Sequence, residues 1–349
     1  MIIVATGKMG HGTFEAKFIP LSRIEQIERI FMVRKEEGPK IDKIEYIVLP
    51  GICRYPLMNG LIATFVLLKT SLRVKADFIL AYHYKPHFFI AYFATVLSGI
   101  PYILGQTGTM VEKYSEKRIL GKLLIHVINK AYGFNVPGSR SRNFWISKGI
   151  NPSKVHLLHS TINTNHFIPT NSVRRYDFIF IGRLALEKRL DRLVMATSIL
   201  AKSIPNVKVC IVGDGPMKSS LCELVASYKL ENSIEFVGFQ NDTYQWLIQA
   251  KCFIMTSESE GLPCALMEAM SCGLPCIVPD INNMRDIVIP GETGFLFDRS
   301  NTTELYKLML YVTNEYDELG QIQSNARRII EEKHSHPYAI SLWKKLLLK

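Results

Sequence analysis

The sequence predicts an α/β protein built from two doubly wound domains, each with a parallel sheet. Short runs of apolar, β-branched or aromatic residues recur along its 349 residues, with helical stretches between them. These runs are apolar throughout instead of alternating, which is typical of strands covered on both faces. Strands separated by helices imply parallel pairing with right-handed crossovers. The length exceeds what one ordinary core needs and suits two domains.

Twelve strands are expected, six in each half of the chain. In the first half they are residues 2–6, 44–49, 77–82, 101–105, 133–137 and 155–159. In the second half they are residues 178–182, 207–213, 234–239, 252–257, 275–279 and 294–297.

The domain boundary is expected in "NHFIPTNSVRRYD" (165–177), which is rich in Pro, Asn and charge. This predicts an N-terminal domain over 1–165 and a C-terminal domain over 170–334, with a helix at about 335–349 that packs back on the first domain. Ligands of doubly wound sheets bind at the carboxyl ends of the strands, so the ligand site is expected where the two domains face each other.

No segment of the chain is expected to span a membrane or to act as a signal peptide for export. "MIIVATGKMG" reads as a strand that runs into glycines, not as a signal peptide. The most apolar stretch, 88–105, is broken by Gly99 and Pro101 and is expected to form a buried helix followed by a strand. Seven scattered cysteines without a CxxC pair favour free thiols in a reducing cytoplasm.

The net charge of +11 lies in the first half of the chain. Residues 51–169 hold 14 Lys and Arg against 3 Asp and Glu, whereas residues 170–349 are close to neutral. This favours an anionic partner for the N-terminal half, such as a membrane surface or a lipid diphosphate. A basic surface with no particular partner is the alternative. Nucleic acid is not expected as a partner, because no recognisable nucleic-acid-binding motif accompanies the charge.

The turn after the first strand of the second half favours phosphate binding. In "FIFIGRLALEKRLDRLV" the strand ends at Gly182, and Arg183 and Lys188 precede a helix. Two cations beside free helix N–H groups can hold a diphosphate, although ion pairing at the surface is the alternative for each. "IVGDGP" (211–216) resembles a dinucleotide fingerprint but has Lys218 in place of the third glycine, so NAD binding is not expected.

Two carboxylates stand out in "SESEGLPCALMEAMSCGLPC" (257–276). Pro263 and Gly273 bound a helix over about 263–272, with Glu260 in the loop before it and Glu268 inside it. The helix is apolar on nearly every face, so Glu268 needs hydrogen-bond donors. The donors are either a core Arg or Lys, or the paired hydroxyls of a ligand such as a ribose. The N–H groups of residues 262–264 can hold a phosphate.

These motifs, followed by "IVIPGETGFLF", resemble the retaining glycosyltransferases of family 4 (glycosyl transferases group 1). The resemblance is continuous over about 177–300, and Glu260 and Glu268 match the family's Glu, seven residues, Glu signature. It implies the GT-B fold, in which two Rossmann-like domains face each other. The resemblance is weaker over 1–165, and two departures occur. "HSTINTNHF" (159–167) replaces the usual Asn-Gly-Val-Asp, and Arg189 replaces a glycine without an obvious defect.

The resemblance implies roles for particular residues. Arg183 and Lys188, after Gly182, would bind the donor's diphosphate and stabilise the leaving nucleotide. Glu268 would grip the ribose hydroxyls, and Glu260 would face the donor sugar. The remaining implied contacts come from the backbone of Gly261 and Leu262, from a glycine loop around Gly10 and Gly12, and from a histidine, either His83 or His87.

The function implied is transfer of a sugar from a UDP- or GDP-linked donor to an acceptor hydroxyl with retained configuration. A hexosyltransferase of cell-surface polysaccharide or glycolipid synthesis is expected, with a lipid-linked or saccharide acceptor, at the cytoplasmic face of the membrane. No tightly bound cofactor is expected, and no metal, because no DxD motif occurs. The alternatives are a nucleotide-sugar epimerase of the same fold and a non-catalytic nucleotide-sugar-binding module.

Overall fold

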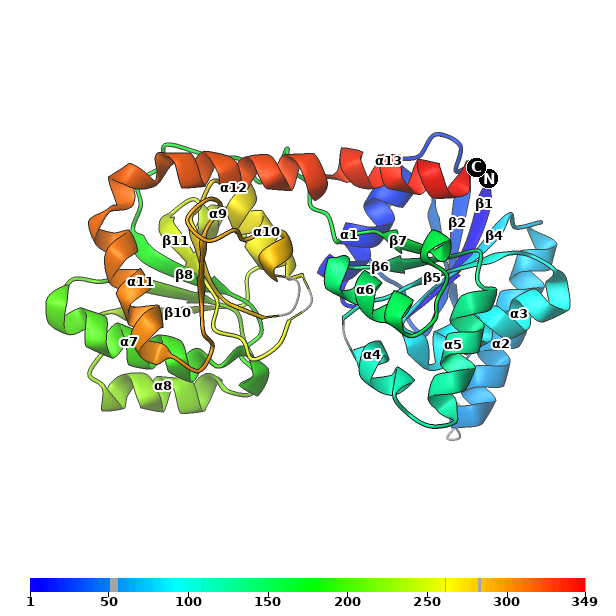
Figure 1. The fold of residues 1–349 in the computed structure, drawn as a ribbon, viewed down its shortest axis with the longest axis horizontal. Helices are drawn as coiled ribbons and strands as arrows, with labels where there is room; N and C mark the ends of the chain where they lie inside the picture. Colours follow the sequence, from blue (N-terminus) through cyan, green and yellow to red (C-terminus); the bar gives the residue numbers. More distant parts are fainter. Residues whose placement is uncertain (51–55, 109, 261, 282–283, 349) are drawn as a thin grey trace. The chain divides into compact units, whose positions relative to one another are not determined.

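The computed structural model describes residues 1–50, 56–108, 110–260, 262–281 and 284–348 of the chain. They divide into two compact units, Met1–Thr161 with His336–Lys349, and Ile162–Ser335. The chain therefore passes from the N-terminal unit to the C-terminal unit after Thr161 and returns after Ser335 (Figure 1). Each unit has its own parallel sheet with helices on both faces.

The N-terminal unit has a seven-stranded parallel sheet. Its strands, in spatial order, are β3 (Ile44–Val48), β2 (Arg29–Arg34), β1 (Ile2–Thr6), β4 (Phe78–Tyr82), β5 (Tyr102–Gly105), β6 (Gly133–Val136) and β7 (Val155–Leu157). Its helices are α1 (His11–Ser22), α2 (Pro56–Arg73), α3 (Phe89–Ser98), α4 (Met110–Ser115), α5 (Leu120–Lys130), α6 (Ser139–Ser147) and α13 (His336–Leu347), with a π-helical turn at Tyr84–Phe88 and a 3-10 turn at Pro152–Lys154.

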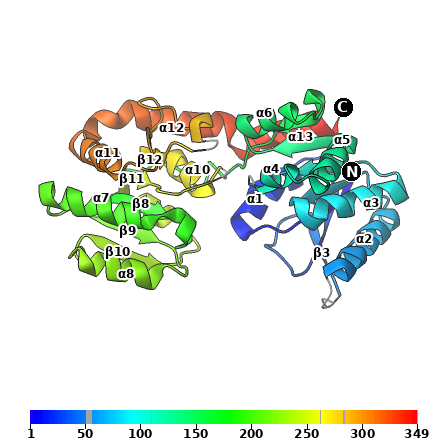
Figure 2. The same ribbon diagram turned by 60° about the horizontal axis from the view of Figure 1, so that its bottom comes forward.

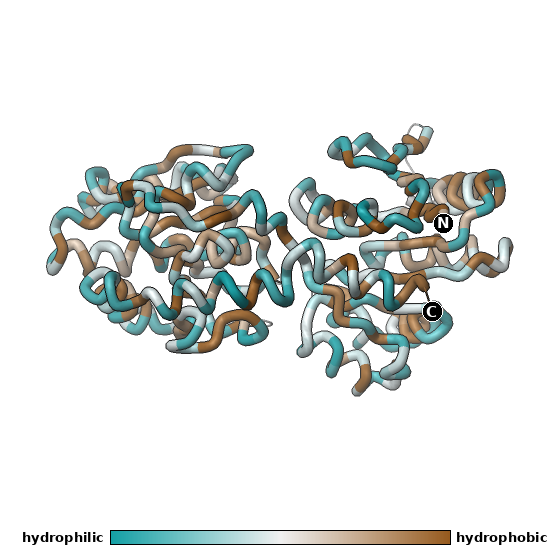
Figure 3. The backbone as a smooth tube through the Cα atoms, turned by 90° about the horizontal axis from the view of Figure 1, so that it is seen from above, coloured by the Kyte–Doolittle hydropathy of each residue, from teal (hydrophilic) through white to brown (hydrophobic). Residues whose placement is uncertain are grey.

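The strand side chains of this unit alternate between two cores. Val4 of β1 packs with α2, α3 and α5, whereas Ile3 and Ala5 pack with α1 and α13 on the other face of the sheet. The C-terminal helix α13 contributes Trp343, which is almost fully buried. Figure 3 shows hydrophobic segments in both units.

The C-terminal unit has a six-stranded parallel sheet. Its strands, in spatial order, are β10 (Ile234–Gly238), β9 (Val209–Val212), β8 (Tyr176–Ile181), β11 (Ala250–Ile254), β12 (Cys276–Pro279) and β13 (Phe295–Phe297). Its helices are α7 (Leu190–Ser203), α8 (Lys218–Ser227), α9 (Tyr244–Leu247), α10 (Cys264–Ser271), α11 (Thr302–Asn314) and α12 (Gly320–Lys333), with 3-10 turns at Leu186–Lys188, Met284–Asp286 and Tyr316–Leu319.

Two cores also lie on the faces of this sheet. Side chains of α7, α8 and α11 form one of them, and side chains of α10 and α12 form the other. Buried residues such as Leu266 and Met270 show that α10 is packed along most of its length. Gly273 follows α10 with φ +72°, the left-handed conformation that ends a helix.

All twelve expected strands are present, with ends that differ by at most three residues. One strand, β2 (Arg29–Arg34), was not expected. Its buried core of four residues is flanked by Arg29 and Arg34 and lacks the Gly or Pro that would mark its ends. The segment 88–105 does form a helix followed by a strand, but the prediction that the helix is buried was wrong, because Phe93, Val96 and Leu97 of α3 are exposed.

Candidate functional site

Lys188 and Glu260 meet at the carboxyl edge of the C-terminal sheet. Strands β8 and β11 are parallel neighbours, so the loops that follow them leave the sheet at the same edge. Lys188 lies in the loop after β8, and its ammonium forms an ion pair with the carboxylate of Glu260, in the loop after β11. The hydroxyl of Ser257 donates to the same carboxylate oxygen at 2.9 Å. With 19% and 13% of their side chains exposed, Lys188 and Glu260 are held in place yet open to a ligand.

Two further hydrogen bonds join these loops. The Thr256 hydroxyl donates to the carbonyl of Lys188 at 2.9 Å, and the backbone N–H of Glu258 donates to the carbonyl of Glu187 at 2.8 Å. The backbone on both sides of the ion pair is therefore fixed by contacts other than the ion pair itself.

Glu268 lies on α10, is partly buried, and is beside a hydroxyl from the connection between β10 and β11. Thr243, the residue before α9, donates from Oγ1 to Glu268 Oε2 at 2.9 Å. Pro263 immediately precedes α10, and the side chain of Leu262 is buried. Gly261 falls outside the residues that the structure describes.

The glycines of "IVGDGP" serve the packing of two loops. A Cβ on Gly213 would lie 1.9 Å from the carbonyl oxygen of Gly182, and a Cβ on Gly215 would lie 2.4 Å from that of Leu184. The two loops are also hydrogen-bonded, with Leu184 N–H donating to Asp214 O at 2.9 Å. This close approach explains the glycine pattern without a dinucleotide. It also fixes the backbone on either side of Arg183, whose side chain is exposed.

A cluster of arginines surrounds Glu258, which was not expected from the sequence. Arg192 donates to the Glu258 carboxylate at 2.8 Å, and Arg299 and Arg189 lie 3.2 and 3.5 Å from it. The hydrogen bond from Arg192 is the main cause that lowers the pKa of Glu258, and the positive charges of the three arginines lower it further. Arg189 also holds Asp191 at 2.8 Å. The sequence suggested that Arg189 only adds positive charge near the phosphates. In the structure its guanidinium is instead paired with two carboxylates.

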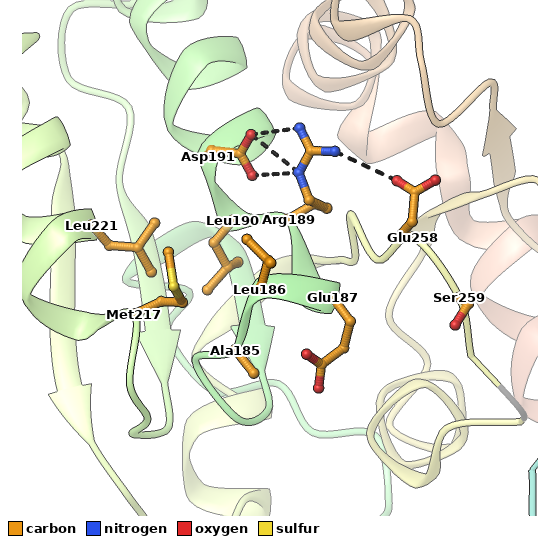
Figure 4. A pocket seen from close by; sticks show the side chains of 10 residues that line it. All are labelled: Ala185, Leu186, Glu187, Arg189, Leu190, Asp191, Met217, Leu221, Glu258 and Ser259. Atoms are coloured by element: carbon orange, nitrogen blue, oxygen red, sulfur yellow. Dashed lines mark hydrogen bonds and ion pairs between the residues drawn. The ribbon is translucent and has the colours of Figure 1, made fainter.

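A cavity of about 600 Å³ lies beside this cluster (Figure 4). Arg189, Asp191 and Glu258 line one part of it, and apolar side chains that include Leu186 and Met217 line another. The loop after β8 thus forms part of the wall of this cavity. Lys188 and Glu260 are not among the residues that line it.

In the N-terminal unit, His87 lies among groups that keep it neutral. Its Nδ1 is 2.9 Å from Thr6 Oγ1, and that hydroxyl donates to the carbonyl of Val33 at 3.1 Å. Because a hydroxyl has one proton, Nδ1 donates to Thr6, which leaves Nε2 as an acceptor. Burial, with the charges of His83, Lys35 and Lys8, lowers the pKa of His87 to about 4.

The two candidate histidines differ in their surroundings. His87 lines a cavity of about 360 Å³ together with Gly7, Lys8 and Arg34. His83 does not line this cavity, and its Nδ1 lies 2.9 Å from the carbonyl oxygen of Lys85. Within the N-terminal unit, His87 is therefore the one of the two that a ligand in the cavity would contact.

The expected glycine loop is shorter than the sequence suggested. Gly10 caps α1, and Gly12 lies in its first turn instead of in a loop. A Cβ on either glycine would meet no atom within 4 Å. Packing within the chain therefore does not require glycine at these positions, so the backbone at this strand-to-helix turn is open to a ligand.

Most of the C-terminal unit matches one family model. Residues 161–329 match the family described as glycosyl transferases group 1. The whole chain resembles the crystal structure of Anabaena HepE in complex with UDP, with a TM-score of 0.84, 16% identity and full coverage of both chains. This confirms the expected GT-B fold. The findings support a glycosyltransferase with that fold.

Curated relatives match part of this chain. An uncharacterized glycosyltransferase of Haemophilus influenzae is 26% identical over 250 residues, which is 64% of this chain and 69% of the relative. The alpha-monoglucosyldiacylglycerol synthase of Acholeplasma laidlawii is 31% identical over 171 residues, which is 48% of this chain and 41% of that protein. The chain thus spans less than half the length of the second relative.

Proposed function

We propose that this protein is a retaining hexosyltransferase of family 4 that moves a sugar from a UDP- or GDP-linked donor to an acceptor hydroxyl. The observation that carries the proposal is the meeting of Lys188 and Glu260 at the carboxyl ends of β8 and β11, inside the segment that matches the glycosyl transferases group 1. A cation and a carboxylate at this edge of a doubly wound sheet suit a phosphorylated sugar.

At the donor, the cations would offset the charge of the leaving group. Arg183 and Lys188 would contact the diphosphate, which gains negative charge as the bond to the sugar breaks. Backbone N–H groups from Leu262 to the start of α10 would add to them, and we propose the same role for Gly261, which lies outside the described residues. We propose that these groups do the work of a metal ion, so that none is required.

Glu268 and Glu260 would hold the hydroxyls of the donor. Glu268 keeps a carboxylate next to Thr243 Oγ1, an arrangement that can accept hydrogen bonds from the two hydroxyls of a ribose. Glu260 would accept from a sugar hydroxyl, and its pairing with Lys188 would bring that carboxylate near a diphosphate bound to Lys188. The conformation of each carboxylate is set by a neighbouring hydroxyl, from Thr243 or Ser257.

We propose front-face transfer for the chemical step. The anomeric carbon–oxygen bond to the diphosphate breaks while the acceptor oxygen bonds to the same face of that carbon. The acceptor's proton passes to the departing phosphate oxygen. Resemblance to the retaining enzymes of family 4 supports this route, and it needs no nucleophilic side chain.

The N-terminal unit would bind the acceptor. His87 is neutral and has Nε2 as an acceptor, so it can receive a hydrogen bond from a sugar or acceptor hydroxyl, whereas His83 is the weaker candidate. The turn at Gly10 and Gly12 would approach the donor's phosphates and sugar. A saccharide or lipid-linked acceptor is proposed, in polysaccharide or glycolipid synthesis. The name of the Acholeplasma relative supports a glycolipid acceptor, and the complex of HepE with UDP-glucose supports a UDP-linked donor.

We further propose that the protein works at the cytoplasmic face of a membrane as a peripheral protein. The excess of basic over acidic residues in 51–169 supports attraction to anionic lipid. Among the helices that the structure describes, none combines the length and the apolar character needed to span a bilayer.

A screen of nucleotide sugars tests the proposal. Thermal shift with UDP, GDP and their hexose conjugates should identify one donor. That donor should be hydrolysed slowly in water alone and consumed faster, by transfer, when the correct acceptor is present. Arg183→Ala and Lys188→Ala should each lower turnover at least about a hundredfold. Unchanged turnover in both variants would show that the assignment is wrong. EDTA should leave the rate of the intact protein unchanged.

The same screen separates the two alternatives. An epimerase would convert the donor alone into a different nucleotide sugar, and a binding module would show a thermal shift without product. Neither has a structural observation in its favour beyond those that the transferase shares.

A further inference from the structure

Large apolar side chains face solvent along α2. Met58, Leu61, Phe65 and Leu72 recur at helical spacing on its outward side, and Leu61 and Phe65 are 68% and 64% exposed. In a surface helix of a globular protein this stripe would be polar. The opposite side of α2 packs into the core through Ala63 and Leu67, so the helix is apolar on both sides.

The exposed apolar surface continues over the two neighbouring helices. α2 packs against α3, and the rings of Tyr92 on α3 and His126 on α5 lie 5.9 Å apart, so the three helices form one layer on one face of the N-terminal sheet (Figure 2). We define the apolar face as Leu61 and Phe65 of α2, Phe93 and Leu97 of α3, and Leu123 of α5 with Ile119 just before it. Exposed apolar side chains from successive helices are more than the scattered single residues that a soluble surface normally shows.

The charges that border this face are basic. Residues 56–130 hold nine Lys and Arg against three Asp and Glu, and α2 itself has Lys69 and Arg73 but no acidic residue. Of the three carboxylates, Glu112 is buried and accepts hydrogen bonds from Gln106 and Ser141, and Asp77 accepts one from the N–H of Ile2. The third, Glu116, is exposed. Lys117, Arg118 and Lys122 flank Ile119 and Leu123.

We infer that the apolar face is the surface by which this protein docks on an anionic lipid layer, an inference that rests on the proposed peripheral membrane function. Apolar side chains would enter the boundary between head groups and acyl chains, and the Lys and Arg side chains around them would contact lipid phosphates. The combination of apolar side chains with a basic border is complementary to an anionic membrane surface. An acidic protein surface would be complementary to the basic border but not to the exposed apolar side chains.

Docking through this face would bring lipid to a cavity of the same unit. The residues of α2 that line the 360 Å³ cavity, including Asn59 and Ile62, alternate along the helix with the exposed Met58 and Leu61. Lys35 and His87 lie on other walls of the cavity. The acceptor class that fits is therefore a lipid whose anionic head group enters the cavity while its chains stay in the bilayer.

Flotation with vesicles of stated composition tests the inference. The intact protein should float with phosphatidylcholine–phosphatidylglycerol vesicles and remain unbound with phosphatidylcholine alone. A triple variant, Leu61→Ser, Phe65→Ser and Leu97→Ser, should bind the mixed vesicles at least about tenfold more weakly. The double variant Lys69→Ala with Lys122→Ala should bind the mixed vesicles about fivefold more weakly for each charge removed. Added salt should reduce the difference in binding between this variant and the intact protein.

A matched control uses exposed apolar residues of the other unit. Met195→Ser with Ile199→Ser changes two exposed side chains on α7 and should leave flotation unchanged. All variants replace outward side chains, so circular dichroism and thermal unfolding should match those of the intact protein. If the triple variant floats as well as the intact protein, or if the control loses binding equally, the apolar face is not the docking surface.

Two further measurements separate this inference from the proposed function and from a second occupant. The triple variant should retain the UDP-induced thermal shift and the slow hydrolysis of donor in water, because none of its residues lies in the proposed site. Flotation without any nucleotide binding would overturn the transferase and leave the docking surface standing. Light scattering that shows a dimer, lost in the triple variant, would assign the face to a second copy of the chain instead.

Discussion

Lys188 and Glu260 form an ion pair although they are 72 residues apart in the sequence. A diphosphate that binds Lys188 must share the ammonium with this carboxylate or displace it. Glu260→Gln removes the charge and keeps the shape, so we expect UDP to bind more tightly, by several-fold. Transfer should fall at least about a hundredfold, because the variant lacks the carboxylate proposed to hold the donor sugar. Calorimetric titration with UDP and steady-state kinetics measure the two effects separately.

Glu258→Gln is the matched control for this prediction. Glu258 lies two residues before Glu260 and is paired with Arg192, Arg189 and Arg299 instead of Lys188. Its replacement should leave the affinity for UDP close to that of the intact protein. Weaker UDP binding by Glu260→Gln would contradict the competition between the carboxylate and the diphosphate.

Thr243→Val tests how Glu268 is positioned. The substitution keeps the size of the side chain but removes the hydroxyl that donates to Glu268 at 2.9 Å. A carboxylate that loses this contact is less well placed for a ribose, so the KM for donor should rise about tenfold with a smaller change in kcat. Thr313→Val, which removes a hydroxyl bonded to the carbonyl of Met309 on α11, is the control and should leave KM unchanged. Equal KM values for donor in the two variants would show that Thr243 does not position Glu268 for donor binding.

The sequence predicted those features that follow from local pattern. The ends of α10 were readable because Pro263 and Gly273 have fixed backbone preferences, and twelve strands were readable because their runs are apolar. Contacts such as Thr243 with Glu268, or Thr6 with His87, join residues 25 and 81 positions apart. No local pattern encodes such pairs, so the fold itself was needed to find them.

Exposure was the other property that pattern could not supply. The apolar run at 88–98 indicated a helix correctly, but a run that is apolar on every side reads as buried whether or not something covers it. The glycines of "IVGDGP" resembled a weak dinucleotide fingerprint, and the sequence did not show which group requires glycine there. The structure identifies it as the carbonyl of Gly182 at Gly213.

Arg189 occupies a backbone conformation that favours glycine. Its φ of 48° and ψ of 45° are left-handed, which explains why the resembled family has glycine there. Arg189→Gly and Arg189→Ala both remove the ion pairs to Asp191 and Glu258, but only the glycine relieves the backbone strain. We therefore expect the glycine variant to be about 1 kcal/mol more stable to unfolding than the alanine variant. Urea denaturation measures the difference, and equal stabilities would mean that the backbone relaxes in the alanine variant.

Stability should fall in mildly acidic solution because two histidines are held neutral. Burial is the first cause that lowers the pKa of His87 and that of His336 to about 4, from an ordinary value of 6.5. The positive groups near His87 are His83, Lys35 and Lys8, and Arg23 is the one near His336. Between about pH 6.5 and 4 the unfolded chain binds protons that the folded chain does not, so the free energy of unfolding decreases as the pH falls through this range.

At pH 5 we expect each histidine to reduce the free energy of unfolding by about 1 to 2 kcal/mol relative to pH 7.5. His87→Asn with His336→Asn should flatten the dependence on pH in this range, whatever its effect on stability at pH 7.5. His126→Asn, which replaces an exposed histidine on α5, is the control and should keep the full slope. Urea denaturation between pH 4.5 and 7.5 provides the measurement. An unchanged slope in the double variant would mean that other groups carry the acid sensitivity.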